Sequence, residues 1–231
     1  LYEDEDEDDN EWEVQYAVEA CSADRIALVS LLVAKGADVN VLDNKGNSPL
    51  SLACGYGLVG VVELLLSHGV DVNLEVGMLR KTALHLACDN NKPVVVAVLL
   101  ATGADVNAVD TRGYSPFFGA SLCGHAEVVT LLVAAEADVN TAENEGRTPL
   151  LSASYRGHTE VVNLLVAAGA RVNMAQNNGR TPLFCACHGG HTEVVTLLLD
   201  AGADASITEN RGITPLFCAS SCGHTEVVTL L

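Results

Sequence analysis

The chain has 231 residues, of which 49% are hydrophobic and only 4% aromatic, and its formal net charge is −18, from 30 acidic and 12 basic residues. This balance argues against a nucleic-acid partner, because contacts with phosphate need clustered Lys and Arg. No apolar run approaches the roughly 18 residues of a membrane-spanning helix, so no membrane partner is expected. Because the chain begins at Leu1 rather than at a Met, it is interpreted as a segment of a larger protein.

An acidic run opens the chain. Nine acidic residues lie between Glu3 and Glu13, and blocks of like charge repel themselves, so residues 1–13 are predicted to be a disordered tail. An alternative is that this tail folds over basic side chains elsewhere in the chain and competes with an acidic ligand. The next segment, from Val14 to Asn40, is interpreted as a degenerate first repeat.

From residue 43 onward one sequence unit recurs. Its marker begins at Ser48, Thr82, Ser115, Thr148, Thr181 and Thr214, with a spacing of 33 residues except for 34 between the first two. A fixed period in this range indicates a repeat array. The predicted repeats are approximately 14–42, 43–75, 76–109, 110–142, 143–175, 176–208 and a truncated 209–231.

The unit that begins at Thr181 predicts two short helices and a projecting loop. Thr181 is expected to be the N-cap and Pro182 the first helical residue. The first helix should run to about His188 and end in a left-handed turn at Gly189-Gly190. The second is predicted from about Thr192 to Asp200 and should end at Gly202.

Acidic residues recur in the loops between units, and in one repeat a glutamate replaces the glycine that ends the second helix. The acids at the loop bases, Asp43, Asp110, Glu143 and Glu209, are expected to fold back on the turn backbone. Glu136 stands where other repeats place Gly at the end of the second helix. It is therefore predicted to adopt a left-handed conformation, at a cost on the order of 1 kcal/mol.

Thr-Pro-Leu, Gly-His-Thr-Glu-Val-Val and Gly-Ala-Asp-Val-Asn at this spacing resemble the motifs of ankyrin repeats. The resemblance covers about Val14 to Leu231 and implies an all-α solenoid of stacked antiparallel helix pairs with projecting β-hairpin-like loops. It also implies a monomeric array that serves as a non-catalytic protein–protein interaction module or scaffold. Partners would bind at the hairpin tips and the concave inner-helix face. The resemblance further implies that the hairpin asparagines are candidates for hydroxylation: Asn40, Asn73, Asn107, Asn140 and Asn173.

The cysteines do not indicate a disulfide framework. One repeat position holds Cys21, Cys54, Cys88 and Cys187 in four units and Ser121, Ser154 and Ser220 in three others. A position that exchanges Cys for Ser is selected for small size. Reduced thiols and an intracellular setting, cytoplasmic or nuclear, are therefore expected.

No catalytic residues or cofactors are expected, and the chain is not predicted to be an enzyme. Residues 55–60 match G-x-G-x-x-G, but they fall between two helices rather than after a strand. Ser, His and Asp are plentiful, yet nothing resembles a strained nucleophile elbow. An alternative is that the chain is the targeting or substrate-recruiting arm of a larger protein, such as a kinase or a ubiquitin-ligase subunit, with its catalytic part elsewhere.

No metal site is expected either. Cys185 and Cys187 are two residues apart on a predicted helix and so project roughly 200° apart. His191 has counterparts in other repeats and is interpreted as a turn-stabilising residue. Cys218 and Cys222 share a helical face, but no second pair completes a tetrahedral set.

The side chains that differ between repeats predict a partner-binding surface. They are Lys45, Tyr56, Lys81, Arg112, Tyr114, Arg147, Tyr155, Arg156, Arg180, His188 and Arg211. Arg and Tyr are frequent at interface hot spots, so an acidic or carboxylate-bearing peptide is the favoured partner. The competing interpretation is that these cations merely keep exposed tips soluble. The most testable group is Arg147, Tyr155, Arg156 and Arg180.

Overall fold

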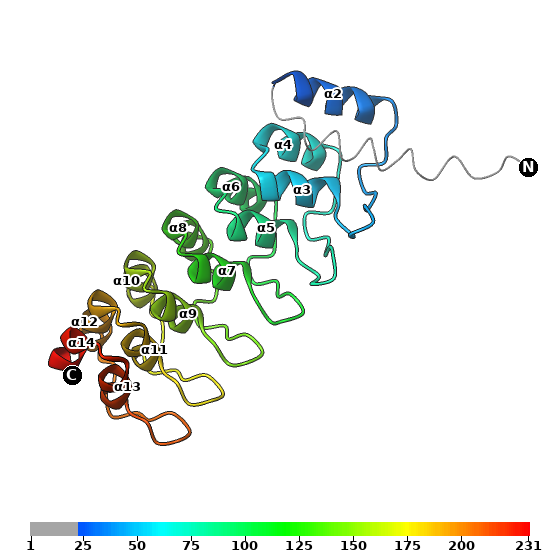
Figure 1. The fold of residues 1–231 in the computed structure, drawn as a ribbon. Coiled ribbons are helices and arrows are strands. Elements are labelled where there is room, and N and C mark those ends of the chain that lie inside the picture. The colour runs from blue at the N-terminus through cyan, green and yellow to red at the C-terminus, as the bar shows by residue number, and fades with distance from the viewer. Residues whose placement is uncertain (1–22) are drawn as a thin grey trace, which may run out of the picture. The chain divides into compact units, whose positions relative to one another are not determined.

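A computed structural model of the chain describes residues 23–231 (Figure 1). These residues form thirteen α-helices, and the only β-type pairing among them is an isolated antiparallel bridge between Val76 and Lys81. The predicted all-α class is confirmed. The acidic tail at 1–13, the beginning of the first predicted repeat and Cys21 lie outside the described residues.

The chain divides into two compact units, the first ending at Asp105 and the second beginning at Val106. The first unit contains α2 (Ala23–Ala34), α3 (Pro49–Tyr56), α4 (Val59–Ser67), α5 (Ala83–Asp89) and α6 (Pro93–Ala101). The second contains α7 (Pro116–Cys123), α8 (Ala126–Ala134), α9 (Pro149–Arg156), α10 (Thr159–Ala167), α11 (Pro182–Gly189), α12 (Thr192–Asp200), α13 (Pro215–Cys222) and α14 (Thr225–Leu230).

Within each unit, every helix packs on its counterpart in the next repeat. In the second unit the first helices α7, α9, α11 and α13 pack in series, and so do the second helices α8, α10, α12 and α14. Figure 1 shows the loops projecting on one side of these helix pairs. Leu150, Leu183 and Leu198 are fully buried between repeats. Because a short helix pair cannot bury both of its faces alone, each repeat depends on its neighbours for stability.

The helix boundaries follow from the predicted capping residues. Thr181 Oγ1 accepts a hydrogen bond from the backbone N–H of Phe184 at 3.2 Å, and Pro182 is the first helical residue. The third repeat differs, because His85 Nδ1 there accepts from the backbone N–H of Thr82 at 3.1 Å. The first helices other than α5 end at a left-handed glycine, such as Gly190 with φ 70°, whereas α5 is followed by the left-handed Asn91 with φ 54°. These predictions from the sequence are confirmed.

A left-handed residue also follows the second helix of each repeat before the truncated last one. Gly169 and Gly202 adopt φ 87° and 85° at this position, and Glu136 adopts φ 60°. The predicted left-handed glutamate is therefore confirmed. The other non-glycine residues with positive φ in the described part are Arg80 and Asn91.

The acids at the loop bases hold the hairpin turns, as predicted. Glu143 Oε1 accepts from the backbone N–H groups of Glu145 at 3.0 Å and Arg147 at 2.9 Å. Asp110 Oδ1 accepts from two amides of its own turn in the same way. Both acids are buried. The third repeat has no such acid, and its turn closes through the longer Val76–Lys81 pairing that its extra residue requires.

Asparagine side chains join consecutive loops. Asn140 Oδ1 accepts from the backbone N–H of Arg171 at 2.8 Å, and Asn173 Oδ1 accepts from that of Asp204 at 2.8 Å. At the loop tips, the backbone N–H of Asn177 donates to the carbonyl of Glu145 at 3.0 Å. The hairpins of the second unit are therefore joined to one another, which gives these asparagines a structural role.

The position that exchanges Cys for Ser is fully buried in five of the described repeats, where Cys54, Cys88, Ser121, Ser154 and Cys187 are all 0% exposed. Ser220, at this position in the last repeat, is exposed. Burial raises the pKa of Cys54 and Cys187 to about 12, which keeps these thiols neutral near pH 7. The prediction that this position requires a small side chain is confirmed for these five repeats.

Candidate partner-binding groove

A groove of about 280 Å³ lies on the second unit beside α9 and α11. Four residues of the predicted surface line it together: Arg147, Tyr155, Arg156 and Arg180. The remaining lining residues are Leu122, Glu145, Leu151, Ser152, Gln176 and Cys185. The groove thus combines three cations with one carboxylate and several apolar side chains.

The repeat geometry explains why these four residues meet. Arg147 and Arg180 each precede the N-cap threonine of a first helix and are 33 residues apart, so they occupy the same place in adjacent repeats. Tyr155 and Arg156 form the last turn of α9, before the left-handed Gly157. Because α9 and α11 pack directly on each other, the helix end and the two hairpin bases converge.

Arg147 is already engaged within the protein. Its Nε lies 3.1 Å from Glu143 Oε1, and Nη2 donates to the hydroxyl of Tyr114 at 2.9 Å and lies 3.5 Å from a carboxylate oxygen of Glu145. Burial alone would raise the pKa of Glu143, but hydrogen bonds from the Arg147 side chain and from two turn amides lower it below its ordinary value. This network fixes the position of Arg147 at the groove. Its positive charge is largely neutralised by the carboxylates of Glu143 and Glu145.

Arg180 is different. Its guanidinium carbon lies 5.3 Å from the centre of the Phe184 ring, within range of a cation–π interaction. Its Nε is buried and has no hydrogen-bond partner, and no ion pair involves Arg180 or Arg156 among the described residues. Arg156 is exposed at the end of α9. The groove therefore presents two cations that the described part of the protein does not neutralise.

The other predicted residues of the second unit lie outside the groove lining. Arg112 pairs with the buried Asp110 at 3.3 Å and lies over the ring of Tyr114 at 4.2 Å. Arg211 pairs with Glu209 at 3.6 Å. His188 is exposed, and its ring stacks on that of Tyr155 with 6.3 Å between centroids.

Three predicted residues belong to the first unit. Lys81 forms an ion pair with Asp89, whereas Lys45 and Tyr56 are exposed, Tyr56 at 63%.

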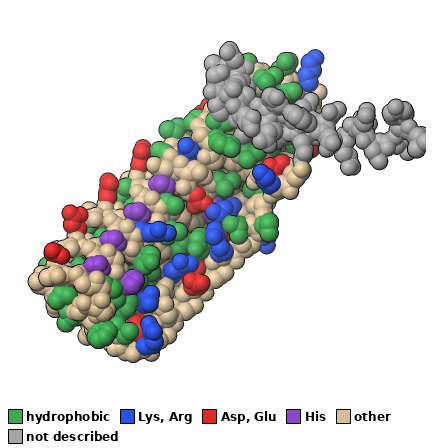
Figure 2. Space-filling view, viewed as in Figure 1, with side chains coloured by type: hydrophobic (Ala, Val, Ile, Leu, Met, Phe, Trp, Pro, Cys, Tyr) green, Lys and Arg blue, Asp and Glu red, His purple; other side chains and the backbone are tan. Residues whose placement is uncertain are grey.

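Most basic side chains near the loops are paired with acids. There are eight of them: Lys45, Arg80, Lys81, Arg112, Arg147, Arg156, Arg180 and Arg211. Five have an acidic partner: Arg80, Lys81, Arg112, Arg147 and Arg211. On the face shown in Figure 2, Lys and Arg side chains accordingly lie beside acidic and hydrophobic ones. For Arg112, Arg147 and Arg211 the partner is the buried acid that closes the turn of the same loop. Arg80 pairs instead with Glu75 and Lys81 with Asp89.

Histidines form a row on the second unit (Figure 2). Nε2 of His158, His191 and His224 lies 3.0–3.1 Å from the backbone carbonyls of Leu122, Tyr155 and His188 in the preceding repeat. A Cβ at Gly157 would come within 2.5 Å of the His191 ring, so this position requires glycine for space as well as for its φ of 75°. The recurring histidines therefore join adjacent repeats. They were predicted to stabilise only the turn of their own repeat.

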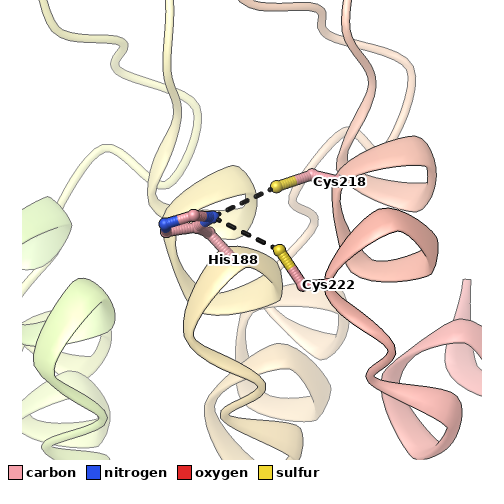
Figure 3. A group of neighbouring side chains, drawn as sticks. All are labelled: His188, Cys218 and Cys222. Carbon is pink, nitrogen blue, oxygen red and sulfur yellow. Dashed lines mark hydrogen bonds between the residues drawn. The ribbon is translucent and has the colours of Figure 1, made fainter.

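One cluster has metal-ligand chemistry. His188 on α11 lies beside Cys218 and Cys222 on α13, and their ligand atoms are all within 4.8 Å of one another (Figure 3). Burial, together with the neighbouring Cys222, raises the pKa of Cys218 to about 11. The sequence interpretation paired the two cysteines but did not combine them with His188, because that residue belongs to the adjacent repeat.

The comparisons with known proteins agree with this architecture. The family model described as "Ankyrin repeats (3 copies)" matches residues 14–110, 84–176 and 169–231. A search of curated proteins gives no match to the chain. Among the described residues, no helix combines the length and the apolar character that crossing a membrane would require.

Proposed function

The chain belongs to the ankyrin-repeat family, whose members in general mediate protein–protein interactions, and we propose that it binds an acidic peptide segment of a partner protein in the groove of the second unit. Members of this family are typically non-catalytic, and the role proposed here is binding without chemistry. The supporting observation is the buried, unpartnered Nε of Arg180 beside the exposed Arg156.

The state of Arg180 favours a carboxylate as the ligand group. A buried N–H without a partner costs roughly 1–3 kcal/mol, which an incoming acceptor would recover. An Asp or Glu side chain supplies two oxygens and can accept both an N–H of Arg180 and the exposed guanidinium of Arg156. Phe184 holds the Arg180 guanidinium from one side, so less side-chain freedom is lost on binding.

The size of the groove favours a peptide over a small-molecule ligand. Its volume of about 280 Å³ is below the roughly 300–1,000 Å³ of typical small-molecule pockets. That space suits one or two side chains of an extended segment. Tyr155 and Leu151 provide an apolar wall for the residue next to the acid.

The negative net charge of the chain excludes long-range electrostatic attraction of an acidic partner. A chain with a formal charge of −18 repels an acidic partner at long range, and salt screens this repulsion over about 10 Å at 0.1 M. Selectivity must therefore come from short-range contacts with Arg156 and Arg180. Nonspecific attraction to a basic surface cannot account for it.

The proposal is tested with peptides selected from a random displayed library on the purified chain. Enrichment of Asp or Glu at one fixed position of the selected peptides is expected. Arg180→Met, which keeps the apolar stem over Phe184 but removes the charge, should weaken a selected peptide about 10- to 100-fold, the equivalent of one charge-assisted hydrogen bond.

Arg211→Met is the matched control. It removes an equal charge from the same unit, but Arg211 pairs with Glu209 and does not line the groove. The affinity of the Arg211→Met variant for the selected peptide should remain within about twofold of wild type, since charges outside the binding site contribute little to binding. Selected peptides without acidic enrichment, or equal weakening by both variants, would contradict the proposal.

A further inference from the structure

His188, Cys218 and Cys222 form a junction between two repeats. His188 lies in the last turn of α11, and the two cysteines are four residues apart on α13, so they share one face of that helix. Figure 3 shows the imidazole directed at both sulfur atoms. Nδ1 lies 3.5 Å from Sγ of Cys218 and 3.7 Å from Sγ of Cys222.

These distances match the edges of a metal coordination tetrahedron. With bonds of about 2.3 Å to sulfur and about 2.0 Å to nitrogen, tetrahedral coordination places N and S atoms about 3.5 Å apart and two S atoms about 3.8 Å apart. The three ligand atoms lie within 4.8 Å of one another. An ion could therefore bind with only small side-chain adjustments.

The cluster is not part of the repeat framework. In the preceding helix pair, α9 and α11, the same three positions hold Tyr155, Cys185 and Gly189. In α7 and α9 they hold Leu122, Ser152 and Arg156. Stacking of the repeats does not require His or Cys at these positions, so packing alone leaves their coincidence at one junction unexplained.

The geometry points to a zinc site formed by His188, Cys218 and Cys222, with its fourth position open to solvent. Thiolate and imidazole ligands favour Zn²⁺ over Mg²⁺ or Ca²⁺, which prefer oxygen. His188 and Cys222 are exposed, whereas Cys218 is buried, so the ion would enter from the surface. Each coordinating cysteine releases its proton to solvent on binding. The bound ion would join α11 to α13.

Cobalt titration tests the site directly, because Co²⁺ occupies tetrahedral zinc sites and is coloured. The full chain, reduced with a phosphine under argon, is titrated with Co²⁺ and then with Zn²⁺. Wild type should bind one Co²⁺ with thiolate-to-cobalt charge-transfer absorption, which stoichiometric Zn²⁺ removes. Cys222→Ser and His188→Gln should each weaken binding by more than about 100-fold, because even loss of a supporting partner costs roughly 10- to 100-fold.

Cys123→Ser is the matched control. Cys123 is exposed at the end of α7, 99 residues before Cys222 and so at the same repeat position. Its substitution should leave cobalt binding unchanged. Cys222 is itself exposed at a helix end, so its serine variant should keep the wild-type circular dichroism spectrum.

Thermal unfolding gives a second measurement. Zn²⁺ should raise the Tm of wild type and of Cys123→Ser but not that of Cys222→Ser, because a ligand stabilises only the folded state that binds it. Absence of charge-transfer absorption at stoichiometric Co²⁺ would overturn the assignment. So would an equal signal from Cys222→Ser, which would place the ion on other thiols.

Discussion

Replacing Glu136 by Gly should stabilise the second unit by about 1 kcal/mol. Glu136 adopts φ 60°, and a left-handed conformation costs an L-residue roughly 1–2 kcal/mol. Glycine avoids this cost but loses roughly 0.5–1 kcal/mol through its more flexible unfolded state. The side chain of Glu136 forms no ion pair within the described residues, so little is lost with it.

The repeat offers the reverse substitution as its own control. Gly169 occupies the same position with φ 87°, and a Cβ there would meet no heavy atom within 4 Å. Gly169→Glu should therefore be destabilising by a similar amount through backbone strain alone. Glu136→Ala separates strain from charge, because it keeps the Cβ but removes a carboxylate that opposes the helix dipole.

Urea unfolding followed by circular dichroism measures these differences. Repeat arrays can unfold in stages, so the m-values of the variants must agree before midpoints are compared. The expected order of stability is Glu136→Gly, then Glu136→Ala, then wild type, with Gly169→Glu lowest. If Glu136→Gly is no more stable than Glu136→Ala, backbone strain at this residue is not the cause and the reasoning fails.

Three further predictions concern polar side chains of the second unit. Ser154→Cys should stabilise by about 1 kcal/mol in urea unfolding, because the buried hydroxyl has no hydrogen-bond partner; an unchanged midpoint would show that the hydroxyl is satisfied. His191→Ala should destabilise by about 1 kcal/mol, since it removes the bond to the carbonyl of Tyr155; unchanged stability would contradict the inter-repeat role. The pKa of Glu143 is lowered on folding, so its stabilising contribution is present above the unfolded pKa of roughly 4.3 and is lost as pH falls through the lower folded pKa. Glu143→Gln should therefore be less stable than wild type at pH 7, and the difference should shrink in acid; a difference independent of pH would refute this.

Local chemistry explains why the helix boundaries could be predicted. A threonine followed by proline fixes a helix start, and a glycine two turns later fixes its end, whatever lies around them. Thr181, Pro182 and Gly190 have the predicted roles, and Glu136 has the predicted backbone conformation. These features depend only on a few residues that are adjacent in the chain, so they can be predicted from the sequence alone.

The chemical state of the candidate site could not be predicted in the same way. The sequence showed that Arg147 and Arg180 occupy equivalent positions, but not that Arg147 would be bound by Glu143 and Tyr114. Arg180 lacks these partners because Gln176 occupies the position of Glu143 in its repeat. Identical positions thus acquire different chemistry from neighbours one loop away.

The sequence by itself determined the repeat period, the helix pairs and the family, because each depends on motifs that recur in phase along the chain. The tertiary structure decided which side chains lack partners within the protein and which come close enough to bind one ligand together. His188 lies 30 residues from Cys218 and 34 from Cys222, on either side of the 33-residue repeat, so only stacking of the repeats brings the three together. Contacts within one helix can be predicted from the spacing of residues in the sequence. Contacts across a repeat junction depend on how two helices pack, and both candidate sites lie at such junctions.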